Sequence, residues 1–115
     1  MSNLTAAPVK FRKAVRIAEE ASLRAGELHN SLTDELEVTP ADLRELNEMV
    51  SQANSKRKSL VDASTAAFFF AAVGHFGKAQ FALIDQDFAL AAELLDLGAA
   101  ELDKVEGHVA GLFRR

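Results

Sequence analysis

The amino-acid sequence contains no cysteine, tyrosine or tryptophan, and its 115 residues include only two prolines. Without cysteine the chain cannot form a disulfide, use a thiolate nucleophile or bind a metal through sulfur. The prolines stand at positions 8 and 40, so few residues interrupt helical segments. Because alanine, leucine and glutamate are abundant as well, the composition predicts an all-α protein.

Acidic residues outnumber basic ones, 17 to 13, so the net charge is −4 and the isoelectric point is about 5.3. An acidic chain repels the phosphate backbone, so we expect no nucleic-acid partner. The one basic cluster, residues 56–58, is interpreted as a solvated stretch. Four basic residues between positions 10 and 16 interrupt the apolar core that a signal peptide needs, and we expect a cytoplasmic protein.

Two segments at the ends of the chain have the periodicity of amphipathic helices, 8–33 and 87–113. Stepping 100° per residue collects the apolar side chains of each segment on one arc. The arc of the first contains Phe11, Ala14, Val15, Ala18, Ala21, Ala25, Leu28 and Leu32. It is rich in alanine, so we expect a neighbouring helix to approach closely.

The second helix is expected to begin at residue 40. Thr39-Pro40-Ala41-Asp42 offers a capping threonine, a proline at the first helical position and an acid in the first turn. The apolar phase continues beyond residue 65, which favours one long helix over 40–73 that continues or kinks to residue 84. A break at Gly74-Gly77 would instead give four helices.

These elements predict a single domain, 1–115, built as an extended antiparallel bundle of three long helices, with packing like that of a coiled coil. In a three-helix bundle the first and last helices run parallel. His29 and Glu106 would then lie near the same end and could form a pair.

Residues 75–79 resemble the phosphoacceptor segment of histidine phosphotransfer domains, which are four-helix bundles. The resemblance lies in His75 and Lys78, one helical turn apart, and it implies that His75 accepts a phosphoryl group steadied by Lys78. Gly77, Ala79 and Gln80 depart from the family pattern. The alternative is a partly buried histidine beside a lysine whose methylene chain covers apolar surface.

No other catalytic pattern is present. The sequence has no glycine-rich phosphate loop, no nucleophile elbow and no arrangement typical of a catalytic triad. The Glu-x-x-His pairs of di-iron bundles are missing too. We therefore expect a protein that is not an enzyme and that holds no metal and no cofactor.

The stretch 63–84 is unusually apolar. Three consecutive phenylalanines, 68–70, sweep about 200° of a helix, more than one neighbour covers. It is long enough to span a bilayer, but His75, Lys78 and Gln80 interrupt it, and a membrane-associated helical protein is kept as an alternative.

The excess of apolar surface predicts a protein–protein contact. We expect a small regulatory protein that forms a homodimer and acts as an adaptor, anti-activator, secretion chaperone or structural subunit. The alternative is that the fold encloses all the aromatic rings. The residues predicted to contact a partner are Phe69, Phe70, Phe76, Phe81, Leu90 and Leu97.

Overall fold

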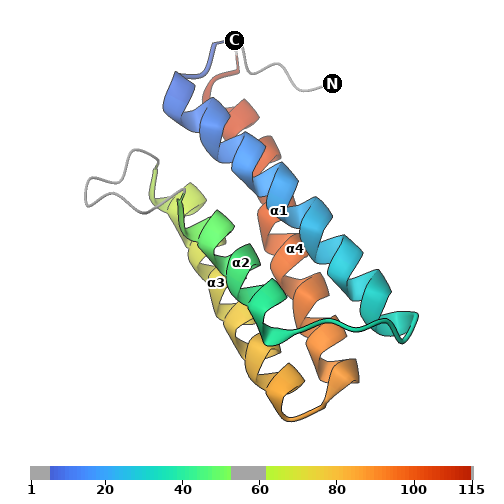
Figure 1. The fold of residues 1–115 in the computed structure, drawn as a ribbon. Helices are drawn as coiled ribbons and strands as arrows, with labels where there is room; N and C mark the ends of the chain where they lie inside the picture. Colours follow the sequence, from blue (N-terminus) through green and yellow to red (C-terminus); the bar gives the residue numbers. More distant parts are fainter. Residues whose placement is uncertain (1–5, 53–61, 115) are drawn as a thin grey trace.

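The protein, seen here in a computed structural model that describes residues 6–52 and 62–114, consists within those residues of four α-helices and no β-strand (Figure 1). The helices are α1 (Val9–Thr33), α2 (Pro40–Ser51), α3 (Ala63–Ile84) and α4 (Phe88–Leu112). They pack against one another as a bundle, so the predicted all-α fold is confirmed. The first and last helices lie within a residue of their predicted bounds.

Successive helices run in opposite directions (Figure 1). α4 packs along both α1 and α3, and α2 packs mainly on α3. The rings of Phe11 in α1 and Phe113 after α4 meet edge to face with centroids 4.9 Å apart, which joins the start of one helix to the end of the other. α1 and α4 are therefore antiparallel, and the parallel arrangement predicted for a three-helix bundle is wrong. The additional helix reverses the chain once more.

The core lies between these antiparallel pairs. α1 contributes an alanine seam with Ala18, Ala21 and Ala25 fully enclosed, as its apolar arc predicts. These small side chains allow α4 to approach α1 closely, and the largest fully buried side chains come from the other three helices. The largest fully buried apolar side chains are Phe69, Phe76, Leu43, Leu46, Leu95 and Leu102.

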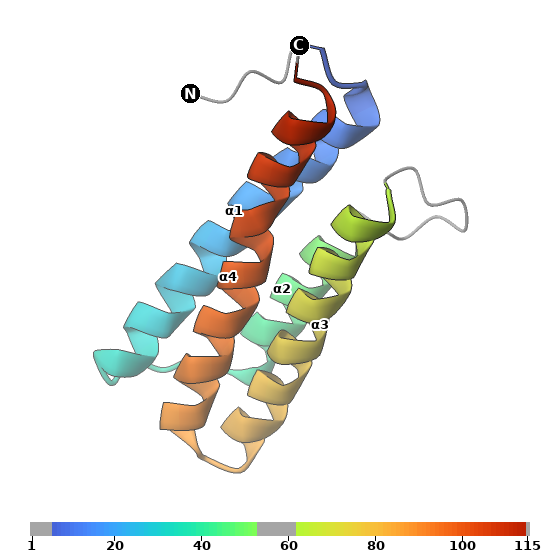
Figure 2. The ribbon, with the colours of Figure 1, turned by 180° about the vertical axis from the view of Figure 1, so that it is seen from behind.

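The prediction of one helix over residues 40–73 is wrong. α2 ends at Ser51, and α3 begins at Ala63 and returns alongside α2 (Figure 2). The apolar phase identifies the buried face of α2, but continued into α3 it points to Phe68, whereas the structure buries Phe69 and Phe76. A repeat of 3.6 residues also cannot distinguish a straight chain from one that folds back. Asp62 is the N-cap residue of α3, and an aspartate at this position is a sequence signal of a helix start that the prediction did not use. The polar run 54–59, with its basic cluster 56–58, lies outside the described residues.

A break at Gly74-Gly77 is also wrong, because both glycines lie inside the 22-residue helix α3. Neither has a positive φ, so both adopt ordinary helical backbone. A glycine in a helix costs only about 1 kcal/mol relative to alanine, and packing against α2 and α4 offsets this cost.

The predicted start of the second helix is confirmed in detail. Thr39 accepts a hydrogen bond from the backbone N–H of Asp42, and the Asp42 carboxylate accepts one from the N–H of Thr39 at 2.9 Å. This reciprocal pair satisfies two backbone donors that a helix start otherwise leaves free. Pro40 occupies the first helical position, where no intrahelical donor is needed.

Candidate interaction surface

α3 presents a row of large apolar side chains on the side that faces away from the bundle. Phe70 and Phe81 are 69% and 71% exposed, and Ile84 is 59% exposed. Eleven residues separate the two phenylalanines, close to three helical turns, so their rings lie on one face of α3. Gly74 and Gly77 lie between them on this face, and exposed Lys78 lies at its edge, one turn before Phe81. We call this surface the α3 apolar face, and it comprises Ala67, Phe70, Gly74, Gly77, Phe81 and Ile84.

The same helix lacks negative charge. α3 contains no aspartate or glutamate, and its ionisable side chains are His75 and Lys78. The excess of carboxylates that gives the chain its net charge of −4 therefore lies on other segments. An apolar face without carboxylates lets two acidic chains meet through this face with little charge repulsion.

Two of the predicted contact residues are not on this surface. Phe69 and Phe76 are 1% and 0% exposed, so their rings belong to the core of the subunit. The prediction that they contact a partner is corrected for a geometric reason. Phe69 is followed 100° around the helix by Phe70, which is enough to turn one ring inward and the next outward.

Leu90 and Leu97 lie two turns apart on α4 and are 42% and 45% exposed, so they remain available as contact residues. Phe88, at the start of α4, is also half-exposed. Sequence reasoning missed Phe88 and Ile84 as surface residues. Both flank the turn between α3 and α4, and a helical arc does not predict exposure at the end of a helix.

At the opposite end of α3, Asp62 joins α3 to α4. Its carboxylate lies 2.7 Å from Nε2 of His108 and accepts a hydrogen bond from the hydroxyl of buried Thr65. Phe68 meets the His108 ring edge to face with centroids 5.8 Å apart. Burial raises the pKa of Asp62, but the hydrogen bonds from Thr65 and His108 and the charge of His108 together lower it below its usual value.

This cluster resembles a catalytic triad in composition but not in order. In a triad the imidazole stands between the hydroxyl and the carboxylate, so that it can take the hydroxyl proton. Here the carboxylate of Asp62 stands between Thr65 and His108. The Thr65 hydroxyl donates to the carboxylate and not to the imidazole, and the cluster therefore positions the start of α3 against α4.

His75 is half-buried on α3, and Lys78, one turn later, is exposed. The His75 ring forms no hydrogen bond or ion pair within the described part of the chain. His75 and Lys78 thus have the helical spacing on which the resemblance to histidine phosphotransfer domains rests, and they stand on one of four packed helices.

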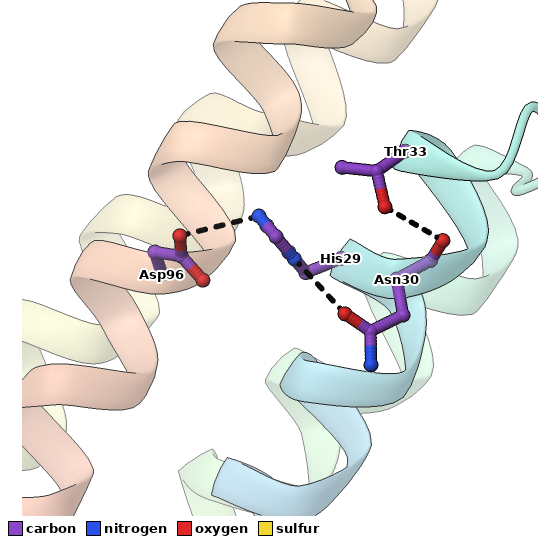
Figure 3. Close-up of polar contacts among 4 residues, drawn as sticks. All are labelled: His29, Asn30, Thr33 and Asp96. Carbon is purple, nitrogen blue, oxygen red and sulfur yellow. Dashed lines mark hydrogen bonds and ion pairs between the residues drawn. The ribbon is translucent and has the colours of Figure 1, made fainter.

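The predicted pairing of His29 with Glu106 is wrong. Figure 3 shows that His29 reaches across to α4 and meets Asp96, with Nε2 3.2 Å from a carboxylate oxygen. Its Nδ1 lies 3.3 Å from the side-chain oxygen of Asn30. Because α1 and α4 are antiparallel, His29 lies near the start of α4 and far from Glu106.

Glu106 instead faces Glu19 on α1. Burial, the charge of Glu106 and a hydrogen bond between the two side chains raise the pKa of Glu19. One turn away along both helices, the Ser22 hydroxyl donates to Asp103 at 2.6 Å. Within residues 6–52 and 62–114, this polar seam included, no group of three or more His, Asp or Glu side chains is placed to hold a metal ion.

α3 is the one helix in the described residues that is long and apolar enough to cross a membrane, judged by length and composition. One third of its most apolar 18-residue window is buried inside the bundle. Comparisons of the chain with protein-family models, with curated proteins and with solved structures gave no significant match, so the surface is interpreted from its geometry alone.

Proposed function

We propose that this protein acts by binding protein rather than by catalysis, and that the α3 apolar face binds a second copy of the chain. One observation carries the proposal. Phe70 and Phe81 are each more than two-thirds exposed on the same face of a helix that has no carboxylate. Two aromatic rings on one face are typical of interaction sites, where aromatic residues are enriched.

The energy available at this face is large compared with that of an ordinary surface residue. A phenylalanine buries about 200 Å² when it is enclosed. Covering the exposed part of one such ring is worth about 3 kcal/mol at about 25 cal/mol per Å², before the costs of association. Phe70 and Phe81 together therefore favour a contact that covers them both.

A homodimer of this kind fits several roles: an adaptor, an anti-activator, a secretion chaperone or a structural subunit. In each role the apolar face of α3 holds the assembly together, and the rest of the acidic surface stays free for regulatory contacts. The proposal therefore begins with self-association, which purified protein alone can test.

Light scattering and sedimentation at micromolar concentration provide this test. We expect the wild-type chain to be a dimer, and Phe81→Asp to be a monomer with unchanged helical circular dichroism, because an aspartate on this face is desolvated in the dimer and solvated in the monomer. Leu23→Asp is the matched control. Leu23 is 72% exposed on α1, away from α3, so this variant should remain a dimer.

A wild-type chain that stays monomeric at high micromolar concentration would contradict the homodimer. Equal loss of dimer in the Leu23 and Phe81 variants would show that added negative charge disrupts the assembly, irrespective of position. Flotation of the wild-type protein with liposomes would favour the membrane-associated alternative instead.

A second candidate function rests on His75. Its imidazole has no partner in the described residues and lies one turn from Lys78 on a four-helix bundle, a setting in which a phosphoryl group could be accepted and steadied. Incubation with a phosphorylated receiver domain should then label wild type and not His75→Gln. His29→Gln, which removes a histidine engaged with Asp96, is the matched control and should keep the label. An unlabelled wild type would exclude this candidate.

A further inference from the structure

The four central residues of the α3 apolar face have the same order of residue types when they are followed in either direction. Phe70 is followed after four residues by Gly74, then Gly77 after three, then Phe81 after four. One position further out on each side, Ala67 lies three residues before Phe70 and Ile84 three residues after Phe81. The centre of this pattern lies between the two glycines, near the middle of α3.

A palindromic face suits a two-fold axis, because such an axis brings together residues that lie at equal distances from its centre. In an isologous dimer one patch contacts its own copy, so that residue i meets residue j and residue j meets residue i. For two antiparallel helices related by an axis through the centre of the pattern, Phe70 meets Phe81 of the second copy, and Gly74 meets Gly77. A parallel pair would instead place each residue against itself.

We propose that two copies of the chain associate through antiparallel α3 helices that cross at Gly74 and Gly77, with Phe70 of each copy stacked on Phe81 of the other. This inference rests on the proposed function and adds the register of the dimer to it. The crossing at glycine allows the two backbones to approach closely, and the rings close the contact on both sides of it.

Packing within the described part of the subunit does not explain these glycines. Among residues 6–52 and 62–114, a Cβ at residue 74 would meet no atom within 4 Å, and one at residue 77 would meet the Asn47 amide nitrogen at an ordinary contact distance of 3.8 Å. Glycine weakens a helix relative to alanine, and neither position needs its conformational freedom. Close packing of a second copy's α3 against this helix would explain both glycines.

Charge and area are consistent with a second copy. The face contains no carboxylate, so two chains of net charge −4 meet where neither has negative charge. The four exposed rings of a dimer offer on the order of 500 Å² of surface. A specific interface buries about 1,200 Å² or more, and Ile84, Phe88 and the small residues beside the rings can supply further area.

Engineered cysteines test the register directly, because the chain has no cysteine of its own. Tagged Phe70→Cys is mixed with untagged Phe81→Cys at high micromolar concentration and oxidised mildly. We expect mixed disulfides between the two variants. We expect few disulfides within either variant alone, since residue 70 lies about 16 Å along the axis from residue 70 of the partner copy, and a disulfide tolerates about 7 Å between Cα atoms.

A second variant tests the crossing without removing a ring. Gly74 is exposed and a Cβ there meets no described atom of its own subunit, so Gly74→Leu should fold. Its side chain would occupy the crossing and should abolish the dimer in light scattering. Gly107→Leu on α4 is the matched control, because its Cβ also meets nothing within 4 Å, and it should leave the dimer intact.

The outcomes separate this inference from the proposed function. Disulfides that form within each single variant as readily as between the two would overturn the antiparallel register, as would a Gly74→Leu protein that remains a dimer. In both cases the homodimer itself would stand. A wild-type chain that is monomeric in scattering, together with no mixed disulfide between the Phe70→Cys and Phe81→Cys variants, would overturn the homodimer and its register.

Discussion

The ring of Phe76 on α3 fills the space beside Gly98 on α4 that any larger residue would need. A Cβ placed at residue 98 would lie less than 3.0 Å from three carbons of that ring. Both residues are buried, and the ring cannot swing into solvent. Phe76 and Gly98 thus set the distance between α3, which carries the α3 apolar face, and α4.

Gly98→Ala should therefore destabilise the protein, although alanine favours helix. We expect a loss of about 1–3 kcal/mol in the free energy of unfolding, the usual cost of forcing a group into a filled core. Urea denaturation followed by circular dichroism measures it.

Gly107→Ala, on the same helix with no atom near its Cβ, is the control and should gain about 0.5–1 kcal/mol from helix propensity. Replacing Phe76 by the smaller leucine should relieve part of the Gly98→Ala penalty in a double-mutant cycle. Additive losses in that cycle would show that residues 76 and 98 do not compete for the same space.

Phe69 and Phe70 provide a second contrast. Phe69→Ala should cost about 3–5 kcal/mol in unfolding free energy, because a buried ring leaves a cavity. Phe70→Ala should change the stability of the monomer by no more than about 0.5 kcal/mol, because its ring is exposed. Denaturation at low concentration, where a dimer dissociates, compares the two. Equal costs would contradict the orientation of these neighbouring rings.

Within single helices, the sequence was a good guide. The apolar arc of α1 contains the residues that the structure buries, and the capping box at Thr39 located the start of α2. These features depend on residues a few positions apart, so periodicity and local hydrogen bonding suffice to predict them. The composition likewise predicted the all-α class.

Features that depend on how helices meet were not predictable in this way. The apolar phase continues from α2 into α3, and nothing in that phase indicates that the chain turns back between them. The direction of α4 follows from this turn, and so does the partner of His29. The contact of Asp62 with His108 joins residues 46 positions apart. The sequence predicted excess apolar surface in the stretch 63–84, where Phe70 and Phe81 are exposed, but the arc alone did not separate buried Phe69 from exposed Phe70.

The pairing of Asp62 with His108 predicts a pH dependence. Because the pKa of Asp62 is lower in the folded chain than its ordinary value of 3.8, folding favours the ionised carboxylate. The resulting stabilisation is complete above that value and is lost as the pH falls through the folded pKa. Asp62→Asn should therefore cost about 1 kcal/mol at pH 6 and much less at pH 2.5.

Urea denaturation at the two pH values measures this difference, and Asp85→Asn, at the exposed turn after α3, is the control. An Asp62→Asn protein with the same penalty at both pH values would indicate that the residue acts through shape alone.

Glu19 and Glu106 predict the opposite dependence. Burial and the nearby carboxylate of Glu106 raise the pKa of Glu19 above its ordinary value of 4.5, so the folded chain holds this proton more tightly than the unfolded chain does. Stability should therefore fall as the pH rises through the folded pKa. Glu19→Gln removes the repulsion and should stabilise the protein at pH 7 by roughly 0.3 kcal/mol, the usual size of a surface charge pair, with no gain at pH 3.5. Thermal unfolding at both pH values measures the effect, and Glu20→Gln is the control one position along the helix. A gain at pH 7 that Glu20→Gln reproduces would trace the effect to net charge and not to the contact with Glu106.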